Sequence, residues 1–294
     1  MTLDTSAWPG QQHLLDTWDE LRALDLLENV AELHAFGLTV VGPERTGTPG
    51  LTDRVLDRCL DLLEERTGAR PDLHGGETHR DVFFPSLHWV LFDDPLFEEL
   101  VMHPVTLALG SYLLGRSLVY GGSELFVKGP SSQPDAALQL TLHHDQILMP
   151  APLPSYAQTI NATWTLTDYT RDDGCLAFLP GSHQFGRQPV GDEGTDKAVP
   201  VETPKGSLIL WHGNTWHGSF PKKTPGLRIG LASLYSRKYL ITPEPIREHV
   251  TKEMLDRHDQ RFADVMGVGI PFGWQADGPD MRKLDRAVVR RVYD

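Results

Sequence analysis

One short segment in the carboxyl-terminal half of the chain combines side chains that bind metal ions. Leu-His-His-Asp-Gln (142–146) places His143 and Asp145 two residues apart. Residues two apart in a β-strand project from the same face, so this imidazole and this carboxylate would lie side by side. His144 with Asp145 is the competing pair, but adjacent strand residues face opposite sides. We therefore favour His143 with Asp145.

A third ligand could come from residues 210–220, which offer His212 and His217. Two imidazoles and one carboxylate with open coordination positions form the facial arrangement of non-haem Fe(II) oxygenases. Zinc accepts the same ligands, so the ligand set alone leaves the metal open. Arg228 follows His217 by 11 residues. Its planar guanidinium could pair with the far carboxylate of a metal-bound dicarboxylate, although a surface arginine on an edge strand is the alternative.

The segments around these residues have the pattern of a strand-rich core. From about residue 117, short β-type runs alternate with turn-rich pieces and no helical pattern intervenes. This favours an antiparallel sandwich or barrel. The predicted strands of this region are 118–127, 138–145, 159–168, 175–180, 207–212 and 227–236.

Helical patterns dominate the amino-terminal third. Apolar residues at helical spacing, capping residues and prolines suited to a first turn mark the expected helices. A short strand is expected at 38–41. The expected helices are 11–35, a segment capped by Thr52 and ended by Gly68, two segments opened by Pro95 and Pro104, and about 245–257.

The composition is that of an ordinary globular domain. A chain of 294 residues can bury a large core without covalent staples. Cys59 and Cys175 fall in separate predicted elements, which argues against a disulfide or a thiolate metal site. We expect a single domain over 1–294. Its expected parts are a helical part at about 11–115, a β core at about 117–240, and a carboxyl-terminal helix and tail at 243–294.

The net charge limits the classes of partner that the protein is expected to bind. The formal net charge is −13, from 27 basic and 40 acidic residues. A surface of that sign repels phosphate backbones and anionic lipids, so we expect a small-molecule partner and neither nucleic acid nor membrane. The first residues lack a signal-peptide pattern, and no run of 18 apolar residues occurs, which predicts a cytoplasmic protein. The oligomeric state is left open.

Four stretches resemble the phytanoyl-CoA dioxygenase family, which includes ectoine hydroxylases and tailoring enzymes of natural-product pathways. The resemblance covers roughly 117–237, with weaker agreement in the helical third. It implies a mainly β fold with flanking helices, built on a double-stranded β-helix of the jelly-roll or cupin type. The stretches are LHHDQ (142–146), WTLTDYTRDDGCLAFLPGSH (164–183), KGSLILWHGNTWHGS (205–219) and Arg228.

The resemblance also implies residue roles. It makes His143, Asp145 and His217 the ligands of Fe(II). It makes Arg228 the partner of the distal carboxylate of 2-oxoglutarate, to which Ser219 would donate a second hydrogen bond. Asn161 would be a further contact of the co-substrate. With O₂, such a site is expected to hydroxylate an unactivated C–H bond and to release succinate and CO₂.

The substrate and the reaction outcome are less defined. The segments 73–92 and 146–157 would form the barrel mouth, and their aromatic, aliphatic and proline content favours a small, mostly apolar metabolite or natural-product intermediate. Because halogenating relatives have a small residue in place of the carboxylate, Asp145 favours hydroxylation over chlorination. Desaturation, ring closure and epimerisation remain alternatives.

The remaining candidate residues receive structural interpretations. His144 is expected to face a packed layer, His183 to fix its loop, and His212 to pack or hydrogen-bond near the site. Lys128 is expected to be a solvated strand-end lysine, with contact to an anionic group as the alternative. Trp164 and Trp216 are expected in the core.

Two functional alternatives remain. One is an O₂-independent cupin-type isomerase or hydrolase with the same ligands. The other is a non-catalytic β-sandwich that binds a ligand or a partner.

Overall fold

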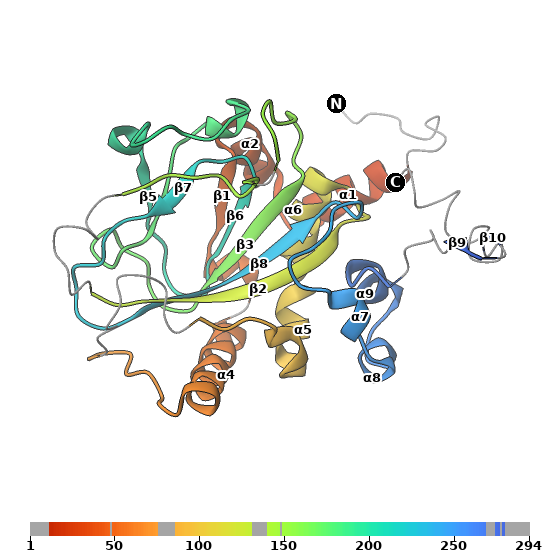
Figure 1. Cartoon of the computed structure of the whole chain (residues 1–294), viewed down its shortest axis with the longest axis horizontal. Helices are drawn as coiled ribbons and strands as arrows, with labels where there is room; N and C mark the ends of the chain where they lie inside the picture. Colours follow the sequence, from red (N-terminus) through yellow and green to blue (C-terminus); the bar gives the residue numbers. More distant parts are fainter. Residues whose placement is uncertain are drawn as a thin grey trace.

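Two antiparallel sheets form the β core (Figure 1). The computed structural model describes residues 12–47, 49–75, 86–130, 140–147, 149–268, 274–276 and 278–279. The larger sheet has the strand order β1-β6-β3-β8-β2, and the smaller sheet has the order β5-β4-β7. The mainly β core with flanking helices that the sequence predicts is therefore confirmed.

The strands of the larger sheet are β1 (Leu38–Val41), β2 (Val119–Lys128), β3 (Thr159–Thr165), β6 (Leu208–His212) and β8 (Arg228–Ser236). The smaller sheet contains β4 (Leu176–Phe178), β5 (Val199–Val201) and β7 (His217–Ser219). A separate two-stranded ladder pairs β9 (Trp274–Gln275) with β10 (Gly278–Pro279).

Helices cover the larger sheet on one face and at its edge (Figure 1). The helices are α1 (Gln12–Ala23), α2 (Leu27–Phe36), α3 (Pro43–Thr46), α4 (Pro49–Thr67), α5 (Pro95–Val101), α6 (Pro104–Leu114), α7 (Ile246–His249), α8 (Lys252–Asp256) and α9 (Gln260–Val265). Short 3-10 turns occur at Val90–Phe92, Ser182–Gln184 and Thr195–Lys197.

Side-chain alternation along β3 separates two environments. Ile160, Ala162 and Trp164 are buried in the main hydrophobic core, which they share with the helices. Asn161 and Thr163 project from the other face and line a cavity between the sheets. The core position expected for Trp164 is thus confirmed. The same alternation places the polar side chains of β3 in the wall of the cavity.

The predicted helix starts agree with the structure at Pro95 and Pro104 but not at Thr52. Asp94 caps α5 by accepting a hydrogen bond from the Leu96 amide. Helix α4 begins at Pro49, so Thr52 lies inside the helix and the predicted N-cap was wrong. Proline at a first helical turn requires no amide donor, which allows the earlier start.

Two predicted helices are divided. The segment 11–35 forms α1 and α2, separated at Asp25, whose φ of 54° is left-handed and interrupts the helical hydrogen bonding. The segment 245–257 forms α7 and α8, and α9 follows it. Thr251 and Asp259 accept hydrogen bonds from the first turns of α8 and α9, so each stabilises a new helix start.

The strand prediction was wrong at one functional segment. Within the described residues of 138–145, only His143 pairs, through an isolated bridge to His217. The prediction also missed β5 and β7, which have three residues each and are too short to show alternation. The other predicted strands are present with ends shifted by at most three residues.

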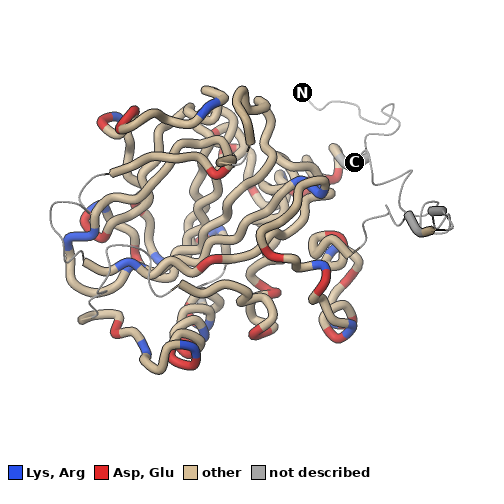
Figure 2. The backbone as a smooth tube through the Cα atoms, viewed as in Figure 1, with Lys and Arg blue, Asp and Glu red and all other residues tan. Residues whose placement is uncertain are grey.

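Charged side chains are distributed mainly over helices and loops, whereas the strands of both sheets carry few (Figure 2). Cys59 and Cys175 are both buried and free, and they lie in different hydrophobic clusters. Among the described residues, no helix combines the length and the apolar character that crossing a bilayer requires.

Candidate metal centre and its pocket

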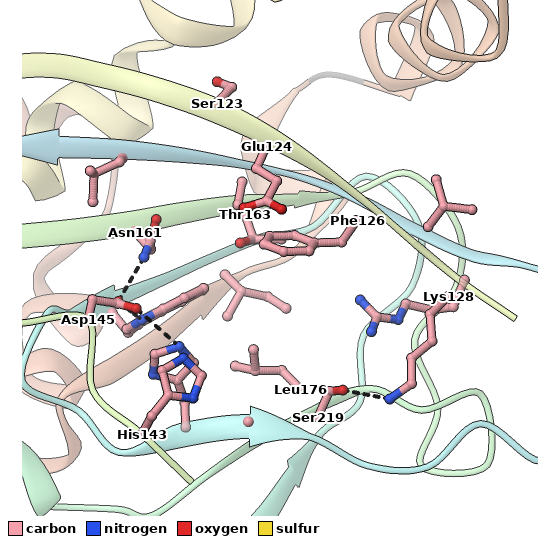
Figure 3. Close-up of a pocket in the computed structure, with 18 of the residues that line it drawn as sticks. Ser123, Glu124, Phe126, Lys128, His143, Asp145, Asn161, Thr163, Leu176 and Ser219 are labelled. Carbon is pink, nitrogen blue, oxygen red and sulfur yellow. Dashed lines mark hydrogen bonds and ion pairs between the residues drawn. The ribbon is translucent and has the colours of Figure 1, made fainter. Parts of the chain in front are cut away.

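The sequence-predicted metal ligands come together at one point between the sheets. One ligand atom from each of His143, Asp145 and His217 lies within 4.8 Å of the others. His217 Nε2 is 3.5 Å from Asp145 Oδ1, and the two imidazole ring centroids are 4.4 Å apart. Figure 3 shows His143 and Asp145 close together on one side of the pocket. Two imidazoles and one carboxylate in this arrangement match a facial triad.

Backbone pairing sets the separation of the two histidines. The His143 amide donates to the His217 carbonyl at 2.9 Å, and the His217 amide donates back at 2.8 Å. The Asp145 amide donates to the carbonyl of Gly213, which anchors the same segment to the turn before β7. The ligand segment is therefore held by the smaller sheet although it is not a strand itself.

Neighbouring groups orient each ligand. His217 Nδ1 lies 2.9 Å from the Thr215 carbonyl, and donation there leaves Nε2 free for a metal. Asp145 Oδ2 accepts hydrogen bonds from Asn161 Nδ2 at 2.7 Å and from Trp211 Nε1 at 3.0 Å, which leaves Oδ1 towards His217. Sequence reasoning missed Trp211, although its alternation with His212 on β6 places it on the pocket face.

His143 has an environment suited to metal binding. His143 lines the pocket and stays exposed there, while the protein around it removes part of its hydration. This desolvation, with a smaller effect from His217, lowers the pKa of His143 to about 4. A neutral imidazole with an available lone pair is the form that coordinates a metal.

The other histidines are directed elsewhere. His144 is buried, its Nδ1 accepts from the Gln146 amide, and its backbone amide donates to Gln188, so it faces a packed layer as expected. His212 packs against His183 with ring centroids 5.4 Å apart, and burial lowers the pKa of His212 to about 3. His212 lies on the face of β6 that is turned away from the pocket, and His183 packs against it there.

The triad opens into a cavity of about 860 Å³. That volume lies in the range of small-molecule sites. We call the part of the cavity formed by Lys128, Tyr169, Ser219 and Arg228 the inner end, where Tyr169 and Arg228 are buried. We call the part formed by His88, Gly122, Glu124, Ile147 and Glu244 the outer end, where His88 and Ile147 are exposed.

Arg228 carries an uncompensated charge at the inner end. It is buried, its Nη1 donates to the Tyr169 hydroxyl at 3.0 Å, and its Nε and Nη2 have no hydrogen-bond partner. Buried guanidinium groups without partners are costly, and two free donors on one planar group match a carboxylate. The alternative of a surface arginine on an edge strand is wrong.

Lys128 is the cross-strand neighbour of Arg228. Its Nζ donates to Ser219 Oγ at 2.5 Å and to the Phe220 carbonyl. Burial, together with the charges of Arg228 and Lys222, lowers the pKa of Lys128 to about 7. The expectation of a solvated strand-end lysine was therefore wrong, because alternation along β2 turns this side chain into the pocket beside Arg228.

A glycine makes room for the residue that supports Arg228. A Cβ at Gly230 would lie 2.0 Å from the Tyr169 hydroxyl oxygen. Gly230 therefore permits Tyr169 to reach Arg228, whose guanidinium carbon also lies 4.7 Å from the Tyr169 ring centroid. Neither Gly230 nor Tyr169 was identified from the sequence.

The side chains present fit a metal ion and a dicarboxylate. The metal position would have two imidazoles and an oriented carboxylate. The inner end would offer Arg228, Lys128 and Ser219 to an anion. The predicted mouth segments contribute His88 and Ile147 to the cavity lining, whereas residues 76–85 and residue 148 lie outside the described residues.

Comparison with protein families identifies a matching model. A family model described as Phytanoyl-CoA dioxygenase (PhyH) matches residues 41–230. Dioxygenase af480 of Aspergillus fumigatus is 30% identical over 129 residues, which cover 43% of this chain and 40% of that protein. Phytanoyl-CoA dioxygenase 1 of Oryza sativa subsp. japonica is 30% identical over 221 residues, which cover 60% and 77%. The chain spans about half the length of the first curated relatives that it matches.

Solved structures with the same fold support the architecture. The epimerase SnoN from nogalamycin biosynthesis, in complex with Fe³⁺, alpha ketoglutarate and nogalamycin RO, has a TM-score of 0.56 and 22% identity and covers 74% of this chain and 84% of its own. EctD from S. alaskensis with bound Fe has a TM-score of 0.55 and 17% identity and covers 72% and 76%. The double-stranded β-helix with amino-terminal helices is therefore confirmed.

Proposed function

Since this chain belongs to the phytanoyl-CoA dioxygenase family, we propose that it is an Fe(II)- and 2-oxoglutarate-dependent oxygenase whose metal ligands are His143, Asp145 and His217. The observation that carries the proposal is the pairing of this triad with the two unpartnered nitrogens of Arg228 in one cavity. A metal site alone would also suit an O₂-independent enzyme. A buried, unneutralised cationic end beside it favours a dicarboxylate co-substrate.

The inner-end residues would bind and orient 2-oxoglutarate. Arg228 would offer Nε and Nη2 to its distal carboxylate, and Ser219 and Lys128 would add donors beside it. The Ser219 hydroxyl, which accepts from Lys128, can still donate its own proton to the carboxylate. Asn161 would act mainly by holding Asp145, because its amide nitrogen already donates to that carboxylate.

Iron with 2-oxoglutarate and O₂ supplies oxidising power sufficient to break an unactivated C–H bond, with succinate and CO₂ as co-products. The protein's own contribution is ligation, orientation and exclusion of water. Trp211 contributes to orientation, because its indole nitrogen donates to Asp145, and to exclusion of water, because its ring lines the cavity. We propose that the substrate is a small, mostly apolar metabolite or natural-product intermediate that is hydroxylated.

The apolar part of the cavity wall supports that substrate class. Phe126, Leu176, Ile209 and Leu234 line it together with Trp211. Walls of this kind stabilise an apolar ligand by removing its surface from water. We also propose that 1–294 forms one domain, because the main hydrophobic core combines residues of α1, the larger sheet and α9.

Anaerobic titration tests the proposal directly. Fe(II) and 2-oxoglutarate are added to the wild-type protein, and the weak visible charge-transfer band of the chelate is followed. We expect a band in the wild type and in His144→Gln, and none in His143→Ala or His217→Ala. His144→Gln is the matched control, because it changes the neighbouring imidazole that faces the packed layer.

Two results would contradict the proposal. Iron bound to the wild type without a band on addition of 2-oxoglutarate would remove the co-substrate and favour an O₂-independent metal enzyme. A band retained in His143→Ala but lost in His144→Gln would reassign the ligand pair. Metal content by mass spectrometry in each variant separates loss of iron from loss of 2-oxoglutarate.

A further inference from the structure

The outer end of the pocket contains the half-buried carboxylate of Glu124. Glu124 projects from β2 into the cavity, above the ring of Phe126 (Figure 3). Within the described part of the chain its carboxylate accepts no hydrogen bond. The ring of His88 lies beside it, with Nε2 3.9 Å from Glu124 Oε1. Burial raises the pKa of Glu124, which reflects the cost of a charge with few compensating contacts.

A second carboxylate lies at the same end. Glu244 is 7% exposed and lines the cavity. The Trp89 amide donates to Glu244 Oε1 at 3.0 Å and the Ser123 amide faces the carboxylate, yet Oε2 has no hydrogen-bond partner. Gly122, at a φ of 132°, approaches so closely that a Cβ there would lie 2.7 Å from Glu244 Cδ. The bulge at Gly122 therefore admits this buried carboxylate to the pocket wall.

Charges in the cavity are separated by sign. The lysines and the arginine that line it are Lys128, Lys222 and Arg228, and all belong to the inner part. Lys222 is neutralised by Asp173 at 3.0 Å, so the other two remain for 2-oxoglutarate. Glu124 stands four residues before Lys128 on β2, which is about 13 Å along an extended strand. Once a metal compensates Asp145, the uncompensated charge at the outer end is negative.

The walls around Glu124 favour an otherwise apolar ligand. Its cross-strand neighbour is Ala232, and Phe126 and Leu234 flank it on the pocket face. A small residue opposite a half-buried carboxylate leaves space for a group on the ligand. An isolated carboxylate in such a wall attracts a cation most strongly, because the surrounding apolar atoms screen little.

We propose that Glu124 binds a protonated amine of the substrate, so that the substrate is a mostly apolar molecule with one basic nitrogen. The inference rests on the proposed function, since the proposed iron position makes the outer end the substrate side. Glu244 adds negative potential at the same end. An anionic substrate, such as one with a free carboxylate or phosphate near this end, is excluded by repulsion.

A matched pair of probes tests the inference. Cyclohexylmethylamine and cyclohexylmethanol have the same ring and differ in the terminal group. Binding of each to the Fe(II)- and 2-oxoglutarate-loaded wild type under anaerobic conditions is measured by ligand-observed NMR and by calorimetry. We expect the amine to bind about tenfold to a hundredfold more tightly than the alcohol, as a charge-assisted hydrogen bond in a partly buried site would give.

Variants test which carboxylate causes the preference for the amine over the alcohol. Glu124→Gln should abolish it, whereas Glu248→Gln, which removes the same charge from the exposed surface of α7, should retain it. Glu244→Gln is expected to reduce it less than Glu124→Gln. The 2-oxoglutarate band is recorded in every variant, so that loss of the co-substrate site is recognised separately.

The outcomes separate the two proposals. Equal binding of amine and alcohol to the wild type, or an amine preference that survives in Glu124→Gln, overturns the inference. If Glu124→Gln weakens the binding of the amine and of the alcohol equally, the carboxylate accepts a hydrogen bond from any donor and does not select a cation. That result also overturns the inference. If the wild type gives no band, the proposed function fails, and the probe preference measured on the same protein still reports on Glu124.

Discussion

At the inner end of the pocket the side chains support one another, whereas at the outer end two carboxylates face the cavity with few partners. Tyr169 holds Arg228, Ser219 holds Lys128, and Gly230 leaves the space that Tyr169 needs. Among the described residues, none supports Glu124 in a comparable way. The difference indicates that the inner end is preorganised for one fixed anion, while the outer end is compensated only when its ligand arrives. Variants at the two ends should therefore affect two different ligands.

The largest effect is expected from the free donors of Arg228. Arg228→Ala should raise the Kd for 2-oxoglutarate by about 100-fold, since two charge-assisted hydrogen bonds contribute on the order of 3 kcal/mol. Arg228→Lys keeps the positive charge but loses the planar pair of donors, so its Kd for 2-oxoglutarate should lie between those of the wild type and Arg228→Ala. The chelate band titration measures both. An unchanged Kd in Arg228→Ala would show that the inner end does not bind the co-substrate.

Loss of the support beneath Arg228 should have the next largest effect. Gly230→Ala forces Tyr169 to move, so we expect about tenfold weaker 2-oxoglutarate binding and a loss of about 1–3 kcal/mol in the free energy of unfolding. Thermal and urea unfolding give the second quantity.

The double variant Gly230→Ala/Tyr169→Phe isolates the contact. Removing the hydroxyl relieves the 2.0 Å clash, so the double variant should recover part of the stability that Gly230→Ala loses. Strict additivity of the two changes would mean that Gly230 and Tyr169 do not interact in this way.

The pH dependence of 2-oxoglutarate binding should follow Lys128. Its pKa of about 7 means that it is charged below pH 7 and neutral above in the ligand-free protein. An anion favours the charged form and raises this pKa, so binding takes up a proton above pH 7. The affinity should be level below pH 7 and fall by up to about tenfold for each pH unit above it.

Calorimetry in two buffers of different ionisation enthalpy counts the protons taken up. Lys128→Met is the control, because it keeps a long unbranched side chain without a titrating group. A slope above pH 7 that persists in Lys128→Met would assign the dependence to another group.

The smallest effect on 2-oxoglutarate binding is expected from a variant at the outer end. Glu124→Gln should change the Kd for 2-oxoglutarate by less than about twofold, because four residues of extended strand lie between Glu124 and Lys128. The band titration that measures Arg228→Ala serves here too. A tenfold change would mean that the two ends are coupled and would remove the distinction drawn between them.

Residues marked by their type and by short separations along the chain were accessible from the sequence. The His143–Asp145 pair and Arg228 belong to this group, and the structure brings them to one cavity. Lys128 was misjudged because its environment depends on its cross-strand partner, Arg228, which lies 100 residues away in the chain. The register of two distant strands is not visible in either strand alone.

Residues that act through a neighbour were also missed. The indole of Trp211 reaches Asp145 from β6, and the hydroxyl of Tyr169 reaches Arg228 from a loop. Ordinary aromatic positions in a sequence carry no sign of such contacts. Most of the strand and helix prediction succeeded because alternation and capping are local. It failed at 138–145, where pairing with a three-residue strand replaces regular structure.

The pair of backbone hydrogen bonds between His143 and His217 has a kinetic consequence. If this bridge opens in a local fluctuation, the two imidazoles separate without unfolding of the larger sheet, and a bound metal is released through that motion. A metal that bridges the same residues must slow the opening in proportion to its occupancy. The amide protons of His143 and His217 should therefore exchange with deuterated solvent far more slowly in the metal-loaded protein, while those of β3 stay unchanged.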